Sequence, residues 1–491
     1  MKTISGSLLL IFIFLPLTAD TWSDLEARVV EHTLANGMQF LIFERHESPL
    51  FSCVMSVEAG SVNEVTNKTG VAHLLEHLAF RGTKSVGTRD YKAEYRATVE
   101  LDSAYERYMR LKDSDADSAY IEKLHDDFEA KKAKAASYIV EGEFFKIYEL
   151  NGGSGLNAGT SYDNTSFIVT LPSNRFELWA AMESERLMNP VFRQFYEERD
   201  VVMEERRMGT DNSPSGLFWE ECNSISYKAH PYGQPIIGHM SDIEHLSRRD
   251  VENFCSTYYA PQKITVAIVG DVDAEKIIPV IDEYFAAIPK KPDPPEVITR
   301  EPEQKNTRRI EMKSKSQPLM SMEFRTVPKW DQDENALSML ASVLGSGRTS
   351  RLCRKLVEER KIARYISAYH MVLRFDGSFT IYGAPMKGYT SADLEKAVLE
   401  ELAGLKTNPV TQDELDAARA RWEVSLYDRF SSNMGMAATL SVGNQYEGGW
   451  RRNFERPKAM KELVSEDLMR AAEKYLNPDH RTVGLLEVEN D

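Results

Sequence analysis

Cysteine is scarce in this chain of 491 residues, which has only Cys53, Cys222, Cys255 and Cys353. Proteins that depend on disulfides have many more cysteines for their length. The four are also too scattered along the chain to have the spacing of zinc ligands. We therefore predict no disulfide framework and expect the cysteines to be buried as small apolar side chains.

Positive charge is in deficit, with 60 Lys and Arg against 76 Asp and Glu, so the net charge is -16. No basic tract offsets this balance, and it argues against a nucleic acid or an anionic membrane surface as partner. Long apolar runs are absent after the first 17 residues, so we expect no membrane span in the mature chain. The length exceeds that of one ordinary core and predicts at least two domains.

The N-terminus has the pattern of a secretory signal peptide. Lys2 precedes an apolar run at 8–17, and Ala19 offers a cleavage point, so we assign 1–19 as the signal. An uncleaved anchor is the alternative. We expect an exported protein, either periplasmic or secreted.

The stretch 70–80 combines charge and apolar side chains in an informative order. On a helix, His73, Glu76 and His77 share one face, while leucines fill the others. Two imidazoles at this spacing can bind one Zn²⁺, and the carboxylate between them can take a proton from water. The order H-x-x-E-H is the inverted zinc-peptidase signature. The alternative is a half-buried helix whose polar groups serve only the fold.

The remaining sequence alternates between strand and helix patterns. We expect strands within 31–44 around the Asn36-Gly37 turn, at 51–57, within 156–172 and at 263–273, and a helix at 173–188. The segment 90–141 lacks Gly and Pro and is rich in charge, which predicts a helical-hairpin insertion at about 90–146. A proline-rich stretch at 289–308 predicts a linker between domains at 27–288 and 309–491.

The part of the chain after this linker repeats the part before it. Asn189-Pro190-Val191 between two predicted helices matches Asn408-Pro409-Val410, and the strand at Phe51 matches Leu319, an offset of 268 (319 − 51). At this offset the H-x-x-E-H positions fall within 339–345, where no histidine or carboxylate occurs. Polar residues that the fold requires should recur in both copies. Their loss in the second copy therefore indicates a functional site in the first.

A catalytic zinc site needs a third protein ligand and one open position. Glu198 and Glu205 are two helical turns apart and face the same way, so either can supply it. The repeat places Ala417 and Val424 at these positions. The spacing alone does not choose between the two glutamates.

Together with five other segments, the H-x-x-E-H stretch resembles the pitrilysin-type (inverzincin, M16) zinc metallopeptidases. The five segments are HLAFRGT, LNAGTSYDNT, ERDVVMEERR, HPYGQPIIG and VGDVD. The resemblance is strongest to the branch of mitochondrial processing peptidase and its bacterial relatives. It implies an α+β protein with two homologous α/β-sandwich domains, the first carrying the charged helical hairpin.

The resemblance also implies roles for individual residues. His73, His77 and Glu205 would bind Zn²⁺, one ion per chain, with Glu76 as the general base and Glu198 as the partner of a ligand histidine.

Further from the metal, Asn157-Ala158 would begin the edge strand to which the substrate adds as an extra strand. Tyr365 matches a family tyrosine that stabilises the oxyanion. The family arginine seven residues earlier is Glu358 here, so that role is not carried over.

The sequence therefore predicts a zinc-dependent endopeptidase that hydrolyses extended peptides or small polypeptides. The alternative is a non-catalytic, zinc- and peptide-binding subunit of a peptidase complex. Because the family's chamber is built from four such domains, the resemblance implies a homodimer or a pairing with a related subunit.

Overall fold

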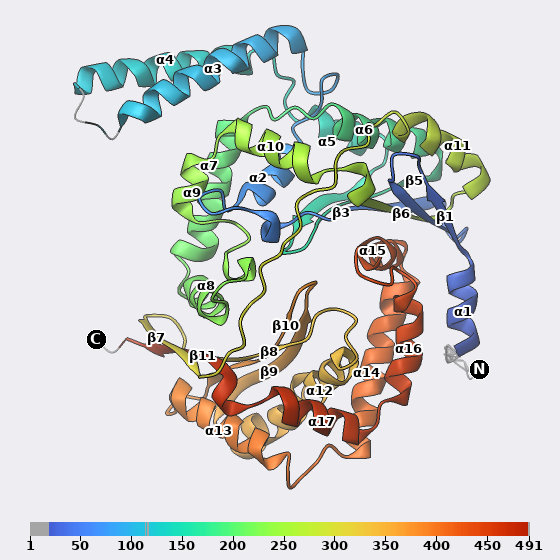
Figure 1. Cartoon of the computed structure of the whole chain (residues 1–491), viewed down its shortest axis with the longest axis vertical. Helices are drawn as coiled ribbons and strands as arrows, with labels where there is room; N and C mark the ends of the chain where they lie inside the picture. Colours follow the sequence, from blue (N-terminus) through green and yellow to red (C-terminus); the bar gives the residue numbers. More distant parts are fainter. Residues whose placement is uncertain (1–18, 113, 115–116, 490–491) are drawn as a thin grey trace, which may run out of the picture.

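Two β-sheets, each covered by helices, make up the body of this computed structural model, which describes residues 19–112, 114 and 117–489 (Figure 1). The predicted signal peptide lies outside the described residues except for Ala19. No helix in the described ranges combines the length and apolar content needed to cross a bilayer. All four cysteines are free, and Cys53, Cys222 and Cys255 are buried.

The first sheet has six strands in the order β1-β2-β6-β3-β5-β4, and only β2 and β6 are parallel neighbours. Its strands are β1 (Val29–Thr33), β2 (Gln39–Glu44), β3 (Leu50–Val57), β4 (Ser154–Thr160), β5 (Thr165–Pro172) and β6 (Ile264–Gly270). β6 is buried at every position because strands lie on both sides of it and side chains cover both faces.

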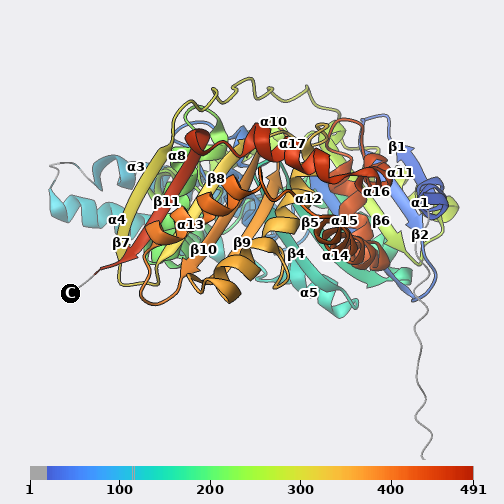
Figure 2. The same cartoon turned by 90° about the horizontal axis from the view of Figure 1, so that it is seen from below.

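The second sheet has the order β7-β11-β8-β10-β9, visible from below in Figure 2. Its strands are β7 (Arg308–Ser314), β8 (Leu319–Thr326), β9 (Ala363–Val372), β10 (Gly377–Pro385) and β11 (Arg481–Val488). Only β7 and β11 are parallel neighbours. The two sheets thus share one topology, and the first has β1 as an additional edge strand.

The helices follow the same repeat. Those of the first half are α1 (Ala19–Ala27), α2 (Val71–Leu78), α3 (Tyr91–Lys112), α4 (Ser118–Ala136), α5 (Glu143–Leu150), α6 (Phe176–Met188), α7 (Phe195–Arg206), α8 (Pro214–Ser226), α9 (Met240–His245), α10 (Arg248–Tyr258) and α11 (Ala274–Phe285). Those of the second half are α12 (Glu334–Gly345), α13 (Ser391–Gly404), α14 (Gln412–Ser431), α15 (Asn433–Gly443), α16 (Arg452–Glu462) and α17 (Ser465–Tyr475).

Each half lends one helix to the sheet of the other. α8 packs on β7 and β11, where Phe218 and Cys222 lie against Gly484. In return α15 packs on β3 and β6, with Leu440 in a shared core with Val54. The proposed division of the chain at 289–308 therefore separates two halves whose cores are completed by each other.

The fold class predicted from the sequence is confirmed: two homologous α/β halves, with a helical hairpin inserted in the first. α3 and α4 pack against each other, and in the chain they come after α2 and before α5. Asp117 caps α4 by accepting from the N–H of Ala119. At the equivalent place of the second half the chain passes from α12 to β9 through one short helix, Cys353–Glu359.

Candidate active site

The helix α2 starts at a sharply turned glycine. Gly70 has φ +86°, and a Cβ there would lie 2.5 Å from the carbonyl oxygen of Ile237, so both the backbone and the space require glycine. The carboxylate of Glu64 accepts from the N–H groups of Gly70 (2.9 Å) and Ala72 (2.8 Å), which fixes the first turn. Burial raises the pKa of Glu64 to about 8 despite these two bonds.

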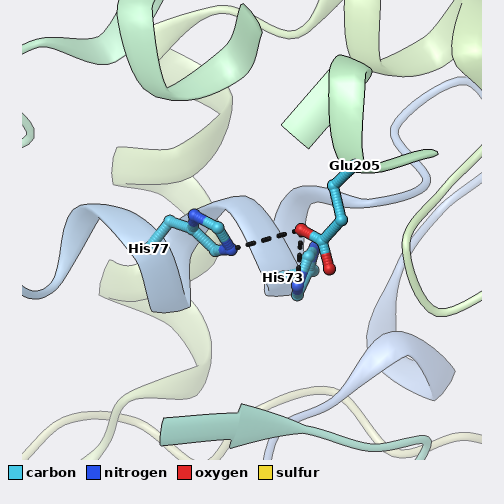
Figure 3. Close-up of side chains that lie close together, drawn as sticks. All are labelled: His73, His77 and Glu205. Carbon is cyan, nitrogen blue, oxygen red and sulfur yellow. Dashed lines mark ion pairs between the residues drawn. The ribbon is translucent and has the colours of Figure 1, made fainter. Parts of the chain in front are cut away.

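His73 and His77 point from α2 toward Glu205 on α7 (Figure 3). Glu205 Oε2 lies 3.6 Å from His77 Nε2 and 3.9 Å from His73 Nε2. His73, His77 and Glu205 each offer one ligand atom, and these three atoms all lie within 4.8 Å of one another. α7 follows directly on Gln194, whose φ of +55° turns the chain into the helix.

The two histidines have opposite electrostatic surroundings. Burial, together with the neighbouring His77, lowers the pKa of His73 to about 4, so His73 is neutral near pH 7. Burial also lowers the pKa of His77, but the hydrogen bond and charge of Glu198 outweigh it. The pKa of His77 is therefore raised above its ordinary value.

Glu198 holds His77 from the side away from Glu205. Its Oε2 lies 3.4 Å from His77 Nδ1, and its other oxygen pairs with Arg81. The Glu198 side chain is only 4% exposed. This pairing favours the tautomer with the proton on Nδ1, which leaves the lone pair of Nε2 directed at the space beside Glu205.

Glu76 lies on the same helix face, with its side chain directed at the first sheet. Its Oε2 accepts a hydrogen bond of 2.7 Å from the hydroxyl of Thr160, at the end of β4. Burial raises the pKa of Glu76, and the bond from Thr160 opposes that rise. The carboxylate thus lies between the histidine pair and the edge of the sheet.

The residues present fit a zinc ion. Two ligand atoms about 2.1 Å from one zinc at a tetrahedral angle are roughly 3.4 Å apart. The Glu205 oxygen lies 3.6 and 3.9 Å from the two histidine nitrogens, and the three ligand atoms all lie within 4.8 Å of one another. The donor set of two imidazoles and one carboxylate is one that zinc accepts in catalytic sites. His73 Nδ1 is buried and has no hydrogen-bond partner within the described part of the chain.

Asn157 and Ala158 lie on β4, which forms one edge of the first sheet. They pair with Ile168 and Phe167 of β5, so one side of β4 is hydrogen-bonded within the sheet. Its backbone on the other side is available to an added strand.

Tyr365 belongs to the second half, whereas the three candidate ligands lie on α2 and α7 of the first. It lies on β9, at the edge of the second sheet, and its ring is 6.3 Å from that of Tyr382. Tyr382 in turn contacts Trp219 of α8 at 5.6 Å. Glu358 lies in the short helix before β9.

Two polar residues of the site were not singled out from the sequence. Thr160 and Arg81 both fall inside the quoted family segments, but only the folded chain brings them to Glu76 and Glu198. No spacing rule connects Thr160 to Glu76, 84 residues earlier.

Two family models match the chain. The model described as Insulinase (Peptidase family M16) matches residues 40–108, which include the H-x-x-E-H stretch. The model described as Peptidase M16 inactive domain matches residues 245–421.

Relatives across bacteria agree with these models. The zinc protease PqqE of Helicobacter pylori is 27% identical over 93% of this chain and 92% of its own length. An uncharacterized zinc protease of Bacillus subtilis, YmxG, is 20% identical over 81% and 83%.

Solved structures show the same fold. A protease from Helicobacter pylori has a TM-score of 0.78 at 24% identity, covering 94% of this chain and 99% of its own. A peptidase M16 inactive domain from Pseudomonas fluorescens has a TM-score of 0.75 at 20% identity, covering 94% and 98%. The periplasmic protease PqqL of Escherichia coli has a TM-score of 0.69 at 16% identity, covering 94% of this chain and 47% of its own.

The fold is that of the M16 peptidases. The chain belongs to the M16 family of pitrilysin-type zinc metallopeptidases.

Proposed function

We propose that this protein is a zinc-dependent endopeptidase that cleaves extended peptides or small polypeptides. The observation that carries the proposal is Glu76, whose carboxylate lies beside the His73–His77–Glu205 cluster and is hydrogen-bonded to Thr160 of the edge strand β4. A site that only binds metal needs no such base.

His73, His77 and Glu205 would hold one zinc ion per chain, with His77 oriented by Glu198. When bound, zinc supplies Lewis acidity that lowers the pKa of water and polarises a peptide carbonyl. Glu76 accepts the proton of the attacking water and returns it to the leaving amine. Thr160 keeps the Glu76 carboxylate directed toward that water.

The substrate would be extended because β4 offers an open strand edge. Asn157 and Ala158 would pair with its backbone, which places the scissile bond in line with the strand that ends at Thr160. Main-chain pairing of this kind selects conformation more than sequence. Tyr365 stays a prediction, which Tyr365→Phe tests through a fall in kcat at unchanged zinc content.

Export and pairing belong to the same proposal. The apolar N-terminus supports export, as does the fold shared with PqqL, which is described as periplasmic. A homodimer or a related second subunit would complete the enclosure of the site. A monomeric mass in solution at full activity would contradict the pairing.

The decisive experiment is cleavage of an unstructured, internally quenched peptide by the purified mature protein beside Glu76→Gln, with zinc per chain counted in both. We expect the wild type to cleave and the variant to keep zinc while losing about 100- to 10,000-fold in rate. Glu149→Gln, an exposed site on α5, is the matched control.

If both proteins hold zinc and neither cleaves any peptide, the endopeptidase proposal fails for the chain by itself. The non-catalytic subunit then becomes the better description. If the wild type holds no zinc, both descriptions fail.

A further inference from the structure

The inserted hairpin packs on the back of α7, the helix that carries Glu198 and Glu205. The ring of Tyr105, on α3, lies 4.5 Å from that of Tyr196 on α7. Phe128, on α4, meets the same Tyr196 edge-on at 5.3 Å. The hydroxyl of Tyr196 donates to Asp102 Oδ1 at 3.0 Å, so α3 and α7 are joined by both apolar and polar contacts.

One residue further along α7 from Glu198, Arg199 extends into the same contact. Its side chain is buried, and its guanidinium carbon lies 4.8 Å from the centroid of the Tyr105 ring. It also donates to the carbonyl oxygen of Leu246 at 3.3 Å. A buried cation loses hydration, and the face of Tyr105 replaces part of that loss.

A second connection lies at the start of both helices. Arg193, just before α7, forms a buried ion pair with Glu94 of α3 at 2.8 Å. Its other N–H groups donate to the carbonyls of Arg81, Thr83 and Val86 at 2.7 to 2.9 Å. Glu94 therefore neutralises the charge that ties the loop after α2 to the start of α7.

These contacts place α7 between two supports. Glu198 and Glu205 face α2, while Tyr196 and Arg199 face the hairpin. The loop tied by Arg193 begins at Arg81, the residue that holds Glu198. Figure 1 shows the hairpin (cyan) at the periphery of the first half, outside the sheet and its covering helices.

We propose that the α3–α4 hairpin is a brace for the metal site: it fixes α7 relative to α2, and Tyr105 and Tyr196 are positioning residues for Glu205 and Glu198. This inference rests on the zinc site of the proposed function. The second half supports this proposal. Its α14, the counterpart of α7, lacks the candidate ligands, and the described chain between α12 and β9 contains no inserted hairpin. A hairpin that only adds stability would alter unfolding and leave metal affinity unchanged.

The test measures the Zn²⁺ dissociation constant of the metal-free protein by competition with a chromophoric chelator, together with its unfolding midpoint. Tyr105→Ala removes the ring that touches both Tyr196 and Arg199. We expect zinc binding to weaken about tenfold, as for other residues that orient ligands from behind. Tyr120→Ala, an exposed tyrosine on α4, is the matched control and should leave affinity unchanged.

A pair of conservative variants provides a finer test and covers the case in which Tyr105→Ala does not fold. Tyr196→Phe cuts only the hydrogen bond between α7 and Asp102, so we expect zinc binding to weaken by about threefold. Tyr105→Phe keeps the ring against Tyr196 and Arg199 and loses the hydroxyl, which meets the carbonyl of Glu244 at 3.4 Å and interacts with Arg199, so an affinity close to that of the wild type should be retained.

The brace is overturned if Tyr105→Ala and Tyr196→Phe bind zinc as tightly as the wild type, whatever their unfolding midpoints. That result would leave the endopeptidase proposal standing, since the wild type still binds zinc. A wild type without zinc affinity would instead overturn the proposed function and the brace together.

Discussion

The two halves of this protein share a sheet topology but differ at one helix. In the first half, α2 faces the edge strand β4 through the bond from Thr160 to Glu76. In the second half, α12 packs directly on the edge strand β9. At the offset of 268 residues His77 falls on Gly345, where a Cβ would lie 1.9 Å from the backbone nitrogen of Ala368.

The two halves differ in what lies between this helix and the edge strand. In the second half the backbone of α12 at Gly345 lies against β9, and Ser338 of α12 meets His370 of β9 at 3.0 Å. Burial shifts the pKa values of side chains at this place in both halves, His73 and Glu76 in the first and His370 in the second. The first half differs in carrying two histidines and Glu76 on one helix face, with Glu198 beside His77. The two halves share one topology, but among the described residues only the first brings two histidines and a glutamate together at this helix.

The largest expected effect comes from giving α2 the residues of α12. His73→Ala with His77→Gly copies Ala341 and Gly345. Loss of a residue that merely orients a ligand costs roughly 10- to 100-fold in affinity, so two lost ligands should weaken zinc binding at least about 10,000-fold. Zinc per chain after dialysis measures it, and circular dichroism should show the fold retained.

The matched control for this change is His125→Ala, at an exposed histidine of the hairpin. It should keep full zinc content. Zinc retained by the double variant would mean that the metal is bound elsewhere.

The converse change tests how closely α12 packs on β9 in the second half. Gly345→Ala forces a Cβ against β9, and we expect it to lower the free energy of unfolding by about 3 kcal/mol, the upper end for overpacking. Urea unfolding measures the change. Gly404→Ala, where a Cβ meets nothing within 4 Å, should be neutral. Equal stabilities of the two variants would contradict this close packing of α12 on β9.

The two halves also differ just before this helix. At the same offset of 268 residues, Glu64 of the first half corresponds to Gln332 of the second. Because the folded pKa of Glu64 is about 8, above its ordinary 4.5, the folded state keeps a proton that the unfolded state releases between these values. Wild-type stability should therefore fall as pH rises through this window. Relative to Glu64→Gln, we expect a loss of about 3 kcal/mol between pH 5 and pH 8.

This prediction is measured by unfolding both proteins at about pH 5 and pH 8. Glu149→Gln, at an exposed glutamate, serves as the reference and should follow the wild type at both. A pH-independent difference between wild type and Glu64→Gln would show that Glu64 is ionised in the folded protein.

The smallest effect concerns the contact between α2 and β4. Thr160→Val keeps the shape and removes the hydroxyl that orients Glu76, so kcat/KM should fall about tenfold, the value of one hydrogen bond to a charged group. Thr160→Ser should retain most of the activity, and both variants should keep zinc. An unchanged rate for Thr160→Val would contradict the role of Thr160 and mean that α2 orients the Glu76 carboxylate without it.

Much of the site could be predicted because it lies on two helices. His73, Glu76 and His77 are within one helical turn of each other, so periodicity alone puts them on one face. Glu198 and Glu205 share a face for the same reason. Thr160 and Arg81 could not be predicted by spacing, since their partners lie 84 and 117 residues away in sequence.

The class of fold, the internal repeat and the helix face that carries the candidate ligands follow from the sequence alone, because they depend on local periodicity and on comparing the chain with itself. The folded chain was needed to show that Glu205 reaches both histidines while Glu198 reaches only His77, that each half lends a helix to the other, and that the hairpin packs behind α7. Those outcomes depend on contacts between segments far apart in the chain, and no local pattern encodes them.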